Sequence, residues 1–551
     1  MQLLNDIRLN NLRGDIFGGL TAAIIALPMA LAFGVASGAG PAAGLYGAIL
    51  VGLFASLFGS TPTLISEPTG PMTVVMTAVI ANLIASNPEQ GMAMAFTVVI
   101  MAGFLQILFG IFKLGHYVTM MPYTVVSGFM TGIGIILIVL QMAPFLGHAT
   151  PSGGVLGSVS SLPELISNIE PAETLLAVST FLLILFFPKN WARFMPPQLM
   201  ALIAGSLVTV FLLSDLDIRQ IGEIPTGLPD FQMPVFDTHH WIIMFADAAV
   251  LAVLGGIDAL LTSVVAENLT RKEADANKEL LGQGVGNMFS GMFGGLPGAG
   301  ATMGTVLNIK TGASSALSGL VRAAILLVVI IWLADLTASI PLAVLSGIAM
   351  KVGMDIIDWS FIKRVHIISP KAALIMYGVI LLTVFVDLIT AVAIGVFIAN
   401  VLTIERIAKI QSDSVTTINE SDNANQLTGD EQMLLKEAKG NILIFSLGGP
   451  LTFGMAKVIS RKHAVLEKHE VLVLDFTEVP VLGVSSSLAL ENLILEDVRN
   501  RKPVYIVGAS DTVKNRIAAL GLTKVLTENS FFNDREEALK QANLYFEKIS
   551  A

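Results

Sequence analysis

Long apolar segments separated by short polar ones run from residue 15 to residue 404. Most are close to the roughly 20 residues that a helix needs to cross the hydrocarbon core of a bilayer. They lie near 15–36, 43–59, 69–85, 91–112, 120–146, 174–188, 196–213, 240–266, 278–296, 301–309, 315–334, 340–354, 371–387 and 390–404. The pattern predicts an all-α polytopic membrane domain of fourteen spans, several of them short.

Composition supports a protein that resides in a lipid bilayer. The 551 residues are 54% hydrophobic and 13% charged, whereas a soluble domain carries roughly 25% charged residues. The apolar runs do not alternate with polar residues, which excludes a membrane β-barrel. The absence of cysteine excludes disulfides and thiolate chemistry.

Basic residues gather in alternate loops. These are Lys113; Lys189 and Arg193; Arg271, Lys272 and Lys278; and Lys351, Lys363, Arg364 and Lys371. The opposite loops are acidic, with residues such as Glu164, Glu170, Asp215 and Glu223. The positive-inside rule then places both termini in the cytoplasm, with the protein in the cytoplasmic (inner) membrane. Lys310 is the exception to this pattern.

The sequence changes character after Arg406. We predict a transport domain over 1–410, with repeats at about 15–213 and 240–404, and a polar linker over 411–438. Residues 439–551 read as an α/β domain. Its strands are "NILIFSL", "EVLVLDF" and "PVYIVGA", and its helices lie near 453–467, 485–499, 511–520 and 534–548. Such alternation predicts a mixed or mostly parallel sheet covered by helices.

Two segments interrupt the apolar pattern in the same way. "SEPTGPMTVVMT" (66–77) opens the third span and "LPGAGATMGT" (296–305) precedes the tenth. Seven spans separate them, and an odd number reverses orientation, so two seven-span halves would be inverted repeats. Paired Gly/Pro breaks at corresponding places in two halves indicate a transporter's binding site.

A helix that starts inside the membrane leaves up to four N–H groups unpaired, with about half a positive charge at its end. Two such starts would hold an anion without lysine or arginine. The alternative is that these glycines only allow close helix packing.

Asp258 lies near the centre of the eighth span, and Thr262 follows one turn later on the same face. An aspartate inside a membrane costs roughly 2.5–3.5 kcal/mol and indicates function by default. Together with Thr302 and freed carbonyls around Gly300, these oxygens suit a small cation. The alternative is an aspartate that only locks helices together.

Other chemistry is not indicated. Glu67 precedes the first break, where it would cap the half-helix or line an access path. The seven histidines show no metal-ligand spacing, and no Ser-His-Asp or P-loop pattern occurs. We expect neither an enzyme nor a nucleic-acid-binding protein.

Four stretches resemble the SulP anion-permease family: "FGGLTAAIIALPMALAFGVASGAGPAAGLYGAI", "GSTPTLISEPTGPMTVV", "GGIDALLTSVVAENLTR" and "GQGVGNMFSGMFGGLPGAGATMGT". The tail, through "VLVLDFTEVPVLGVSSSLALE", resembles a sulfate-transporter and anti-sigma-factor-antagonist (STAS) domain. The resemblance implies inverted repeats, a core domain that moves against a gate domain, and a homodimer to which the STAS domain contributes.

The resemblance also implies site residues. The anion would lie at Thr69, Gly70, Ala301 and Thr302, and in sodium-dependent bicarbonate transporters of this family Na⁺ would bind at Asp258, Thr262, Gly300 and Thr302. Met29, Phe33 and Gly304 stand where many relatives have glutamine, tyrosine and arginine, which favours a small monoanion. Gly483-Val484-Ser485 departs from the phosphorylatable STAS pattern, so a phosphoserine switch is in doubt.

We therefore predict a sodium-coupled bicarbonate symporter with elevator-type alternating access. One alternative is proton-coupled transport of sulfate or a dicarboxylate, with Asp258 as the proton carrier. Another is an anion channel, or a sensor that signals through the STAS tail.

Overall fold

The computed structural model describes residues 4–118, 122–151, 153–188, 191, 196–222, 229–237, 240–332, 338–386, 388–413, 415–419, 427–451, 455–465, 469–526 and 528–550. Contacts between residues divide the chain into two compact units, Met1–Phe397 and Ile398–Ala551. Each is described by itself. Lys189, Arg193 and Glu223, which entered the orientation argument, lie outside the described residues.

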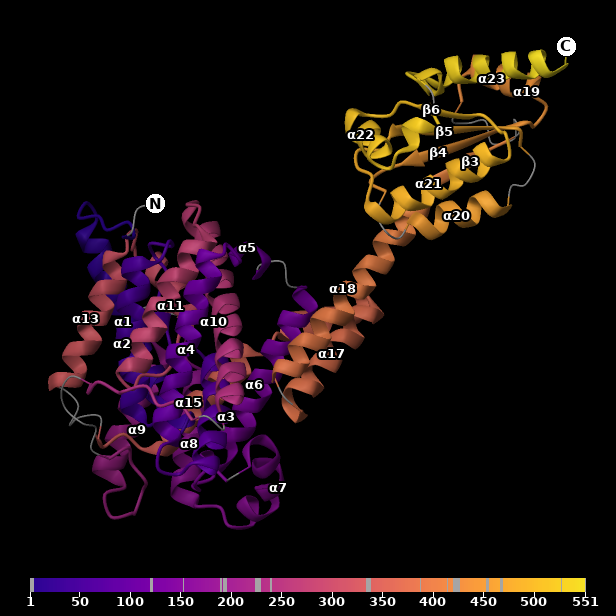
Figure 1. Ribbon diagram of the computed structural model, residues 1–551. Coiled ribbons are helices and arrows are strands. Elements are labelled where there is room, and N and C mark those ends of the chain that lie inside the picture. Colours follow the sequence, from indigo (N-terminus) through magenta and orange to yellow (C-terminus); the bar gives the residue numbers. More distant parts are fainter. Residues whose placement is uncertain are drawn as a thin grey trace. The chain divides into compact units, whose positions relative to one another are not determined.

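The first unit is built from helices and two very short strands (Figure 1). In chain order they are α1 (Leu12–Ala36), α2 (Pro41–Phe58), β1 (Ser66–Glu67), α3 (Gly70–Ser86), α4 (Gly91–Ile111), α5 (Gly115–Val118), α6 (Tyr123–Phe145), α7 (Gly154–Ser167), α8 (Pro171–Leu185), α9 (Pro197–Leu212), α10 (Trp241–Thr270), α11 (Ala276–Met292), β2 (Ala299–Gly300), α12 (Thr302–Lys310), α13 (Leu317–Trp332), α15 (Leu342–Ile356), α16 (Trp359–Ile368), α17 (Pro370–Phe385) and α18 (Leu388–Asp413).

Every apolar segment predicted from the sequence overlaps one of these helices: α1–α4, α6, α8–α13, α15, α17 and α18. Within the described part of the chain, α1, α2, α4, α6 and α10 are long and apolar enough to cross a membrane, and the bent pair α7–α8 adds a sixth candidate. The protein is thus a multi-pass, mostly helical membrane protein. The count of fourteen spans stays a prediction, because helices such as α3 and α12 begin late, after their Gly/Pro breaks.

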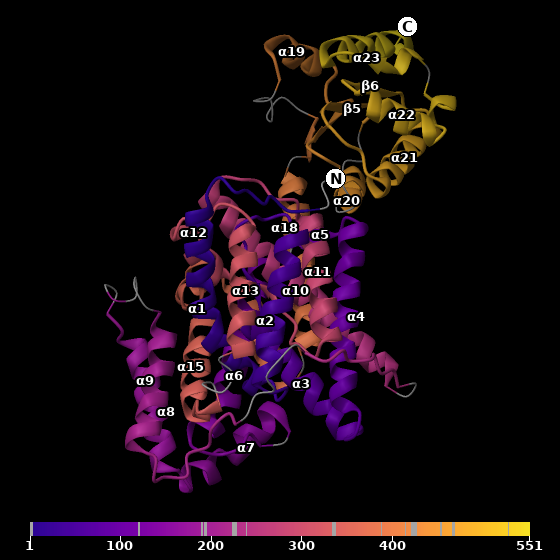
Figure 2. The ribbon, with the colours of Figure 1, turned by 90° about the vertical axis from the view of Figure 1, so that its left-hand side faces the viewer.

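The helices of the first unit pack as a bundle in which α1 contacts α2 and α13, and α11 contacts α2 and α4 (Figure 2). Its largest described apolar cluster includes Leu31 of α1, Leu326 of α13 and Val344 of α15, all buried. Helices that are apolar on most sides, as these are, bury their faces against one another and against lipid.

Lys310 is not an exception to the charge pattern. Two residues after it, the Gly312 carbonyl accepts a hydrogen bond from Asn11 Nδ2 at 2.7 Å. Lys272 Nζ donates to the Ser314 carbonyl at 3.1 Å. The end of α12 therefore lies beside the N-terminal segment and beside a loop that was already counted among the basic ones.

The second unit holds a five-stranded sheet in the order β3–β4–β5–β6–β7. Its elements are β3 (Val415–Ile418), α19 (Gly429–Glu437), β4 (Ile442–Gly448), α20 (Met455–Val465), β5 (Val471–Glu478), α21 (Val484–Arg499), β6 (Val504–Val507), α22 (Asp511–Ala519), β7 (Phe531–Phe532) and α23 (Arg535–Ser550). Strand β3 is antiparallel to β4, and the other pairs are parallel. Helices α20, α21 and α22 cover one face, and α19 and α23 cover the other.

The three strands and four helices expected over 439–551 are present as β4, β5, β6, α20, α21, α22 and α23. The prediction of a plain linker over 411–438 was too broad. Val415 and Ile418 of β3 are buried against the sheet, and Leu435 of α19 is buried below it. Part of the polar segment that indicated a linker belongs to an edge strand and a surface helix, and residues 420–426 lie outside the described residues.

Candidate functional site

The two Gly/Pro breaks, far apart in sequence, lie side by side. Strand β1 pairs with β2 in an antiparallel ladder, with Ser66 opposite Gly300 and Glu67 opposite Ala299. Just beyond the ladder, the Ala301 N–H donates to the Ile65 carbonyl at 2.8 Å. The irregular backbone at each break is therefore satisfied partly by the other break, and Asn287 of α11 bonds both the N–H and the carbonyl of Gly298. Such satisfaction is a condition for irregular backbone within a membrane domain.

A helix starts directly after each strand. Helix α3 begins at Gly70 with Thr69 as its N-cap, and α12 begins at Thr302 with Ala301 as its N-cap. Neither N-cap side chain caps its helix. No side-chain oxygen of the N-cap residue therefore occupies the first N–H groups of either helix. The positive end of each helix dipole is free of such a capping oxygen.

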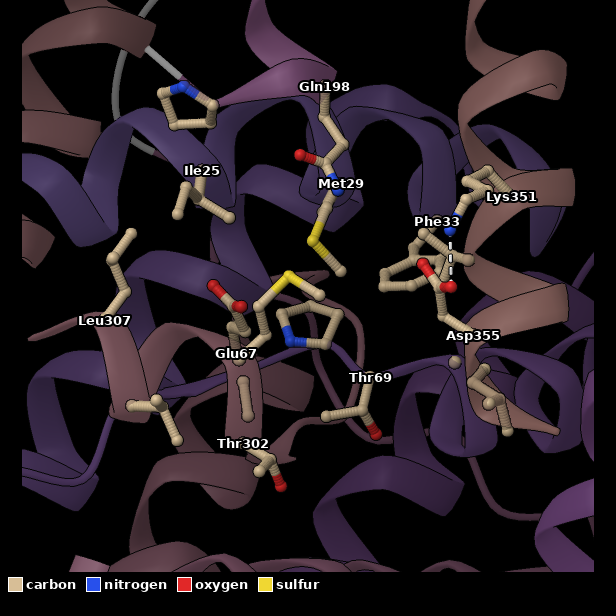
Figure 3. Close-up of a pocket in the computed structure, with 18 of the residues that line it drawn as sticks. Ile25, Met29, Phe33, Glu67, Thr69, Gln198, Thr302, Leu307, Lys351 and Asp355 are labelled. Carbon is tan, nitrogen blue, oxygen red and sulfur yellow. Dashed lines mark hydrogen bonds and ion pairs between the residues drawn. The ribbon is translucent and has the colours of Figure 1, made fainter. Parts of the chain in front are cut away.

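Both helix starts face one cavity of about 770 Å³. Thr69, Gly70, Ala301 and Thr302, which the sequence singled out for the anion, all line it. Figure 3 shows Met29 and Phe33 of α1 and Gln198 of α9 on the surrounding wall. The cavity thus has an apolar side formed by α1 and a polar side formed by the two helix starts.

The residues expected to hold a cation are also brought together. Thr262 Oγ1 of α10 donates to the Gly300 carbonyl at 2.9 Å and lies 2.8 Å from Thr302 Oγ1. Asp258, one turn earlier on α10, lines the same cavity as Gly300 and Thr302. A Cβ at Gly300 would lie 3.0 Å from the Thr262 Cβ and 3.1 Å from the Ala259 Cα, so glycine allows this close approach of β2 to α10 without displacing either neighbour.

Two side-chain oxygens at the cavity are buried and have no hydrogen-bond partner among the described residues: Asp258 Oδ2 and Thr69 Oγ1. Buried polar atoms without partners are uncommon and call for an explanation by function. In the part of the chain that the structure describes, no three His, Cys, Asp or Glu side chains form a metal cluster. The donors here are one carboxylate, hydroxyls and a carbonyl, a hard-oxygen set that fits Na⁺ better than a transition metal.

Sequence reasoning missed several charged groups at this site. Lys310 lines the cavity, as does the Lys351–Asp355 ion pair (Figure 3), and one more charge lies behind it. Arg322 of α13 is fully buried and forms an ion pair with Glu67, which lines the cavity. The signal was present, because Arg322 is a charged residue inside the apolar segment 315–334. The sequence suggested two roles for Glu67, capping the half-helix or lining an access path. Glu67 lines the cavity, and its side chain does not cap α3.

The comparison with family models covers both units. Residues 12–379 match the model described as the sulfate permease family, and residues 433–538 match the STAS domain. The chain belongs to the sulfate permease family. Members of this family are transporters, so the expectation that the chain is not an enzyme is confirmed.

Comparison with individual proteins shows which relatives within the family this chain is similar to. The chain is 60% identical to the bicarbonate transporter BicA of Synechocystis sp. over 99% of its own length and 96% of that protein's. It is likewise 60% identical to BicA of Picosynechococcus sp., over 99% of this chain and 97% of that protein. The solved transmembrane domain of a cyanobacterial BicA is 65% identical and superposes with a TM-score of 0.68, covering 71% of this chain and all of that one.

The residues at which the sequence departs from many members of the sulfate permease family can be located in the structure. Met29 and Phe33 line the cavity (Figure 3). Gly304 lies in the first turn of α12, where an added Cβ would be 3.6 Å from Glu67 Oε1. In the STAS domain, Ser485 is exposed at the start of α21, while Ser486 and Ser487 are buried.

Proposed function

We propose that this protein is a sodium-coupled bicarbonate symporter of the cytoplasmic membrane, with both termini in the cytoplasm. One observation carries the proposal: two helix starts and the unpartnered Asp258 oxygen share a single cavity. An anion and a cation bound there would be close neighbours. The names of the two BicA relatives support bicarbonate as the anion.

The anion is held mainly by backbone. The N–H groups at the starts of α3 and α12 donate to bicarbonate near Thr69, Gly70, Ala301 and Thr302, and the two helix dipoles add positive potential. A planar monoanion with few oxygens needs few donors. The apolar wall of Met29 and Phe33 offers no further hydrogen bonds to a larger dianion.

Sodium completes the site. Asp258, the hydroxyls of Thr262 and Thr302 and the Gly300 carbonyl supply oxygen ligands, and Na⁺ neutralises the Asp258 carboxylate. Without Na⁺ this carboxylate would repel the anion across a medium of low dielectric constant. Anion binding thus follows sodium binding, which is the basis of coupling.

The loaded site then moves as a unit relative to the rest of the membrane domain in an elevator-type step. A 1:1 cycle is electroneutral, so the membrane potential does not drive it. A tenfold sodium gradient, worth about 1.4 kcal/mol, would support about tenfold accumulation of bicarbonate. We include in the proposal a homodimer in the lipid bilayer to which the STAS domain contributes.

The deciding experiment is uptake of ¹⁴C-bicarbonate into liposomes that contain the full-length protein, with and without an inward sodium gradient. Uptake that requires sodium and does not change when the membrane potential is clamped would support the symporter. Uptake that ignores sodium would overturn the coupling, and uptake of sulfate in place of bicarbonate would overturn the substrate. Liposomes without protein provide the background.

A second candidate, proton-coupled transport of sulfate or a dicarboxylate, is favoured by one observation. The unpartnered Asp258 Oδ2 would accept a proton as readily as it would bind a metal ion. Acid-stimulated, sodium-independent uptake in the same liposomes would identify this activity.

A further inference from the structure

The Glu67–Arg322 pair lies directly behind the backbone of the site. Arg322 donates through Nη1 to the carbonyls of Ala48 and Ser66, both at 3.1 Å, and through Nη2 to Glu67. Ser66 is the residue opposite Gly300 in the β1–β2 ladder. The guanidinium therefore holds the strand that positions both helix starts.

The fold is built to admit this cation. Arg322 is fully buried and Glu67 is 3% exposed. A Cβ on Gly52 of α2 would lie 2.5 Å from Arg322 Nη1, so a glycine leaves the space that the guanidinium occupies. A buried arginine needs a counter-charge, which Glu67 supplies, and both Nη atoms donate hydrogen bonds, whereas Nε has no partner among the described residues.

The two oxygens of Glu67 have different surroundings. Oε2 accepts from Arg322, whereas Oε1 lies beside Gly304 in the first turn of α12. Glu67 is also part of the cavity wall (Figure 3). A bound anion would thus experience the negative charge of Glu67 as well as the positive charge of Arg322 behind it.

We propose that Glu67 and Arg322 are a charge-balancing and positioning pair that makes anion binding depend on the cation. This inference rests on the proposed function. Arg322 provides a fixed positive charge, and Glu67 cancels it. Three more charged residues line the cavity, but Lys351 is paired with Asp355 and Lys310 is exposed to solvent at the end of α12. Away from solvent, the site is left with the negative charge of Asp258, which a bound cation would neutralise.

Charge removal from the two partners should have opposite effects. In Glu67→Gln, Arg322 is left uncancelled, so sodium should bind about tenfold more weakly and bicarbonate should need less sodium. In Arg322→Gln, Glu67 is left uncancelled, so sodium should bind about tenfold more tightly and bicarbonate more weakly. Tenfold is the effect of one unit charge at roughly 10 Å with an effective dielectric constant near 20. The double variant should lie within about threefold of the wild type, because its net charge is restored.

The measurement is equilibrium binding of ²²Na⁺ to purified full-length protein, with bicarbonate uptake in liposomes measured in parallel. A purely structural role would weaken sodium binding in both single variants and would not be rescued in the double variant. That result would overturn the inference. If Arg322→Gln does not fold, Glu67→Gln and the double variant still test it, because restoration of sodium binding in the double variant is required.

A second carboxylate–arginine pair of the same unit provides the matched control. Glu173 pairs with Arg219 at 2.7 Å, and neither residue lines the cavity. Glu173→Gln should leave sodium affinity unchanged, and an equal shift there would overturn the assignment to Glu67. The proposed bicarbonate transport and the proposed role of the Glu67–Arg322 pair can be rejected independently of each other. Opposite shifts in ²²Na⁺ binding without bicarbonate uptake would reject the transported substrate alone, and sodium-driven uptake without opposite shifts would reject the pair alone.

Discussion

The starts of α3 and α12 resemble each other in sequence and in backbone, yet different polar groups support them. Behind the start of α3, Glu67 is paired with Arg322, so the formal charge there cancels. Beside the start of α12, Asp258 has an oxygen without a partner among the described residues, and Thr262 bonds to both Gly300 and Thr302. The pair behind α3 adds no net charge to the site, whereas Asp258 adds one negative charge, and the hydroxyls of Thr262 and Thr302 lie on the α12 side.

This difference explains how two related helix starts serve two ligands. Helix N-termini alone attract anions, and two identical starts would form a symmetric anion site. In the proposed symporter, the additional carboxylate of Asp258 would convert half of the site into a cation site. The α12 side should therefore control sodium, while the α3 side should control mainly the anion.

The largest expected effect is at Asp258. Asp258→Asn removes the carboxylate of the proposed cation site, so sodium-dependent uptake should fall by roughly 100-fold or more. Liposome uptake at saturating sodium measures this loss. Asp247→Asn on the same helix, outside the cavity, is the control and should transport normally. Retained sodium dependence in Asp258→Asn would remove the distinction between the two starts.

Thr302→Val sharpens the comparison on the α12 side. The hydroxyl bonds to Thr262 and faces the cavity, so its loss should raise the sodium concentration for half-maximal uptake by about tenfold. Thr311→Val is a matched control, because that hydroxyl bonds to the carbonyls of Leu307 and Asn308 on its own helix. If Thr302→Val changed only the affinity for bicarbonate, the assignment of Thr302 to the sodium site would be contradicted.

Thr69→Val tests the α3 side. Thr69 Oγ1 is buried at the cavity beside Asp258, so we expect the half-saturating bicarbonate concentration to rise about threefold, with a smaller change in sodium affinity than in Thr302→Val. Thr77, whose hydroxyl donates to the Thr73 carbonyl on the same helix, does not line the cavity. Thr77→Val is therefore the control and should leave the half-saturating bicarbonate concentration and the sodium affinity unchanged. A sodium shift as large as that of Thr302→Val would show that the starts are not specialised.

The smallest effect should come from a residue that does not line the cavity. Asp358, in the loop before α16, accepts hydrogen bonds from Tyr123, Ser127, Ser360 and the Phe361 N–H. Burial alone would raise its pKa, but these bonds outweigh it and hold the pKa below its usual value. Asp358→Asn should lower the melting temperature by about 2 °C and leave uptake within about twofold.

The pH dependence of that difference follows from its sign. A carboxylate with a lowered pKa in the folded state stabilises the protein above its ordinary pKa, near 4, and loses this contribution as the pH falls through the folded value. The melting temperatures of wild type and Asp358→Asn should therefore differ equally at pH 7 and pH 5. The gap should shrink below about pH 4, and a gap that grows there would contradict the pKa direction.

Much of the site was visible in the sequence because its elements are local. The Gly/Pro breaks, Asp258 and the i, i+4 position of Thr262 depend only on neighbours along the chain, and the structure brings these residues to one cavity. The antiparallel β1–β2 ladder is also the arrangement that inverted halves would produce. The helices matched the apolar segments for the same reason, since segment length and hydropathy determine them.

Arg322 was missed because its role depends on partners from α2 and β1, which no local pattern reveals. Strand β3 was missed because an edge strand of four residues, "VTTI", has too few apolar positions to stand out from the polar segment around it. Gln198 reaches the cavity wall only through the packing of α9. Such tertiary placements are not encoded in any short window of sequence.

The two-residue ladder between β1 and β2 has one further consequence. Because its hydrogen bonds join the starts of α3 and α12, a displacement of one start carries the other with it. In the proposed transport cycle, ligands for the anion and for the cation would be fixed to one frame and would move together. A few backbone hydrogen bonds would thus keep the two halves of the site in step.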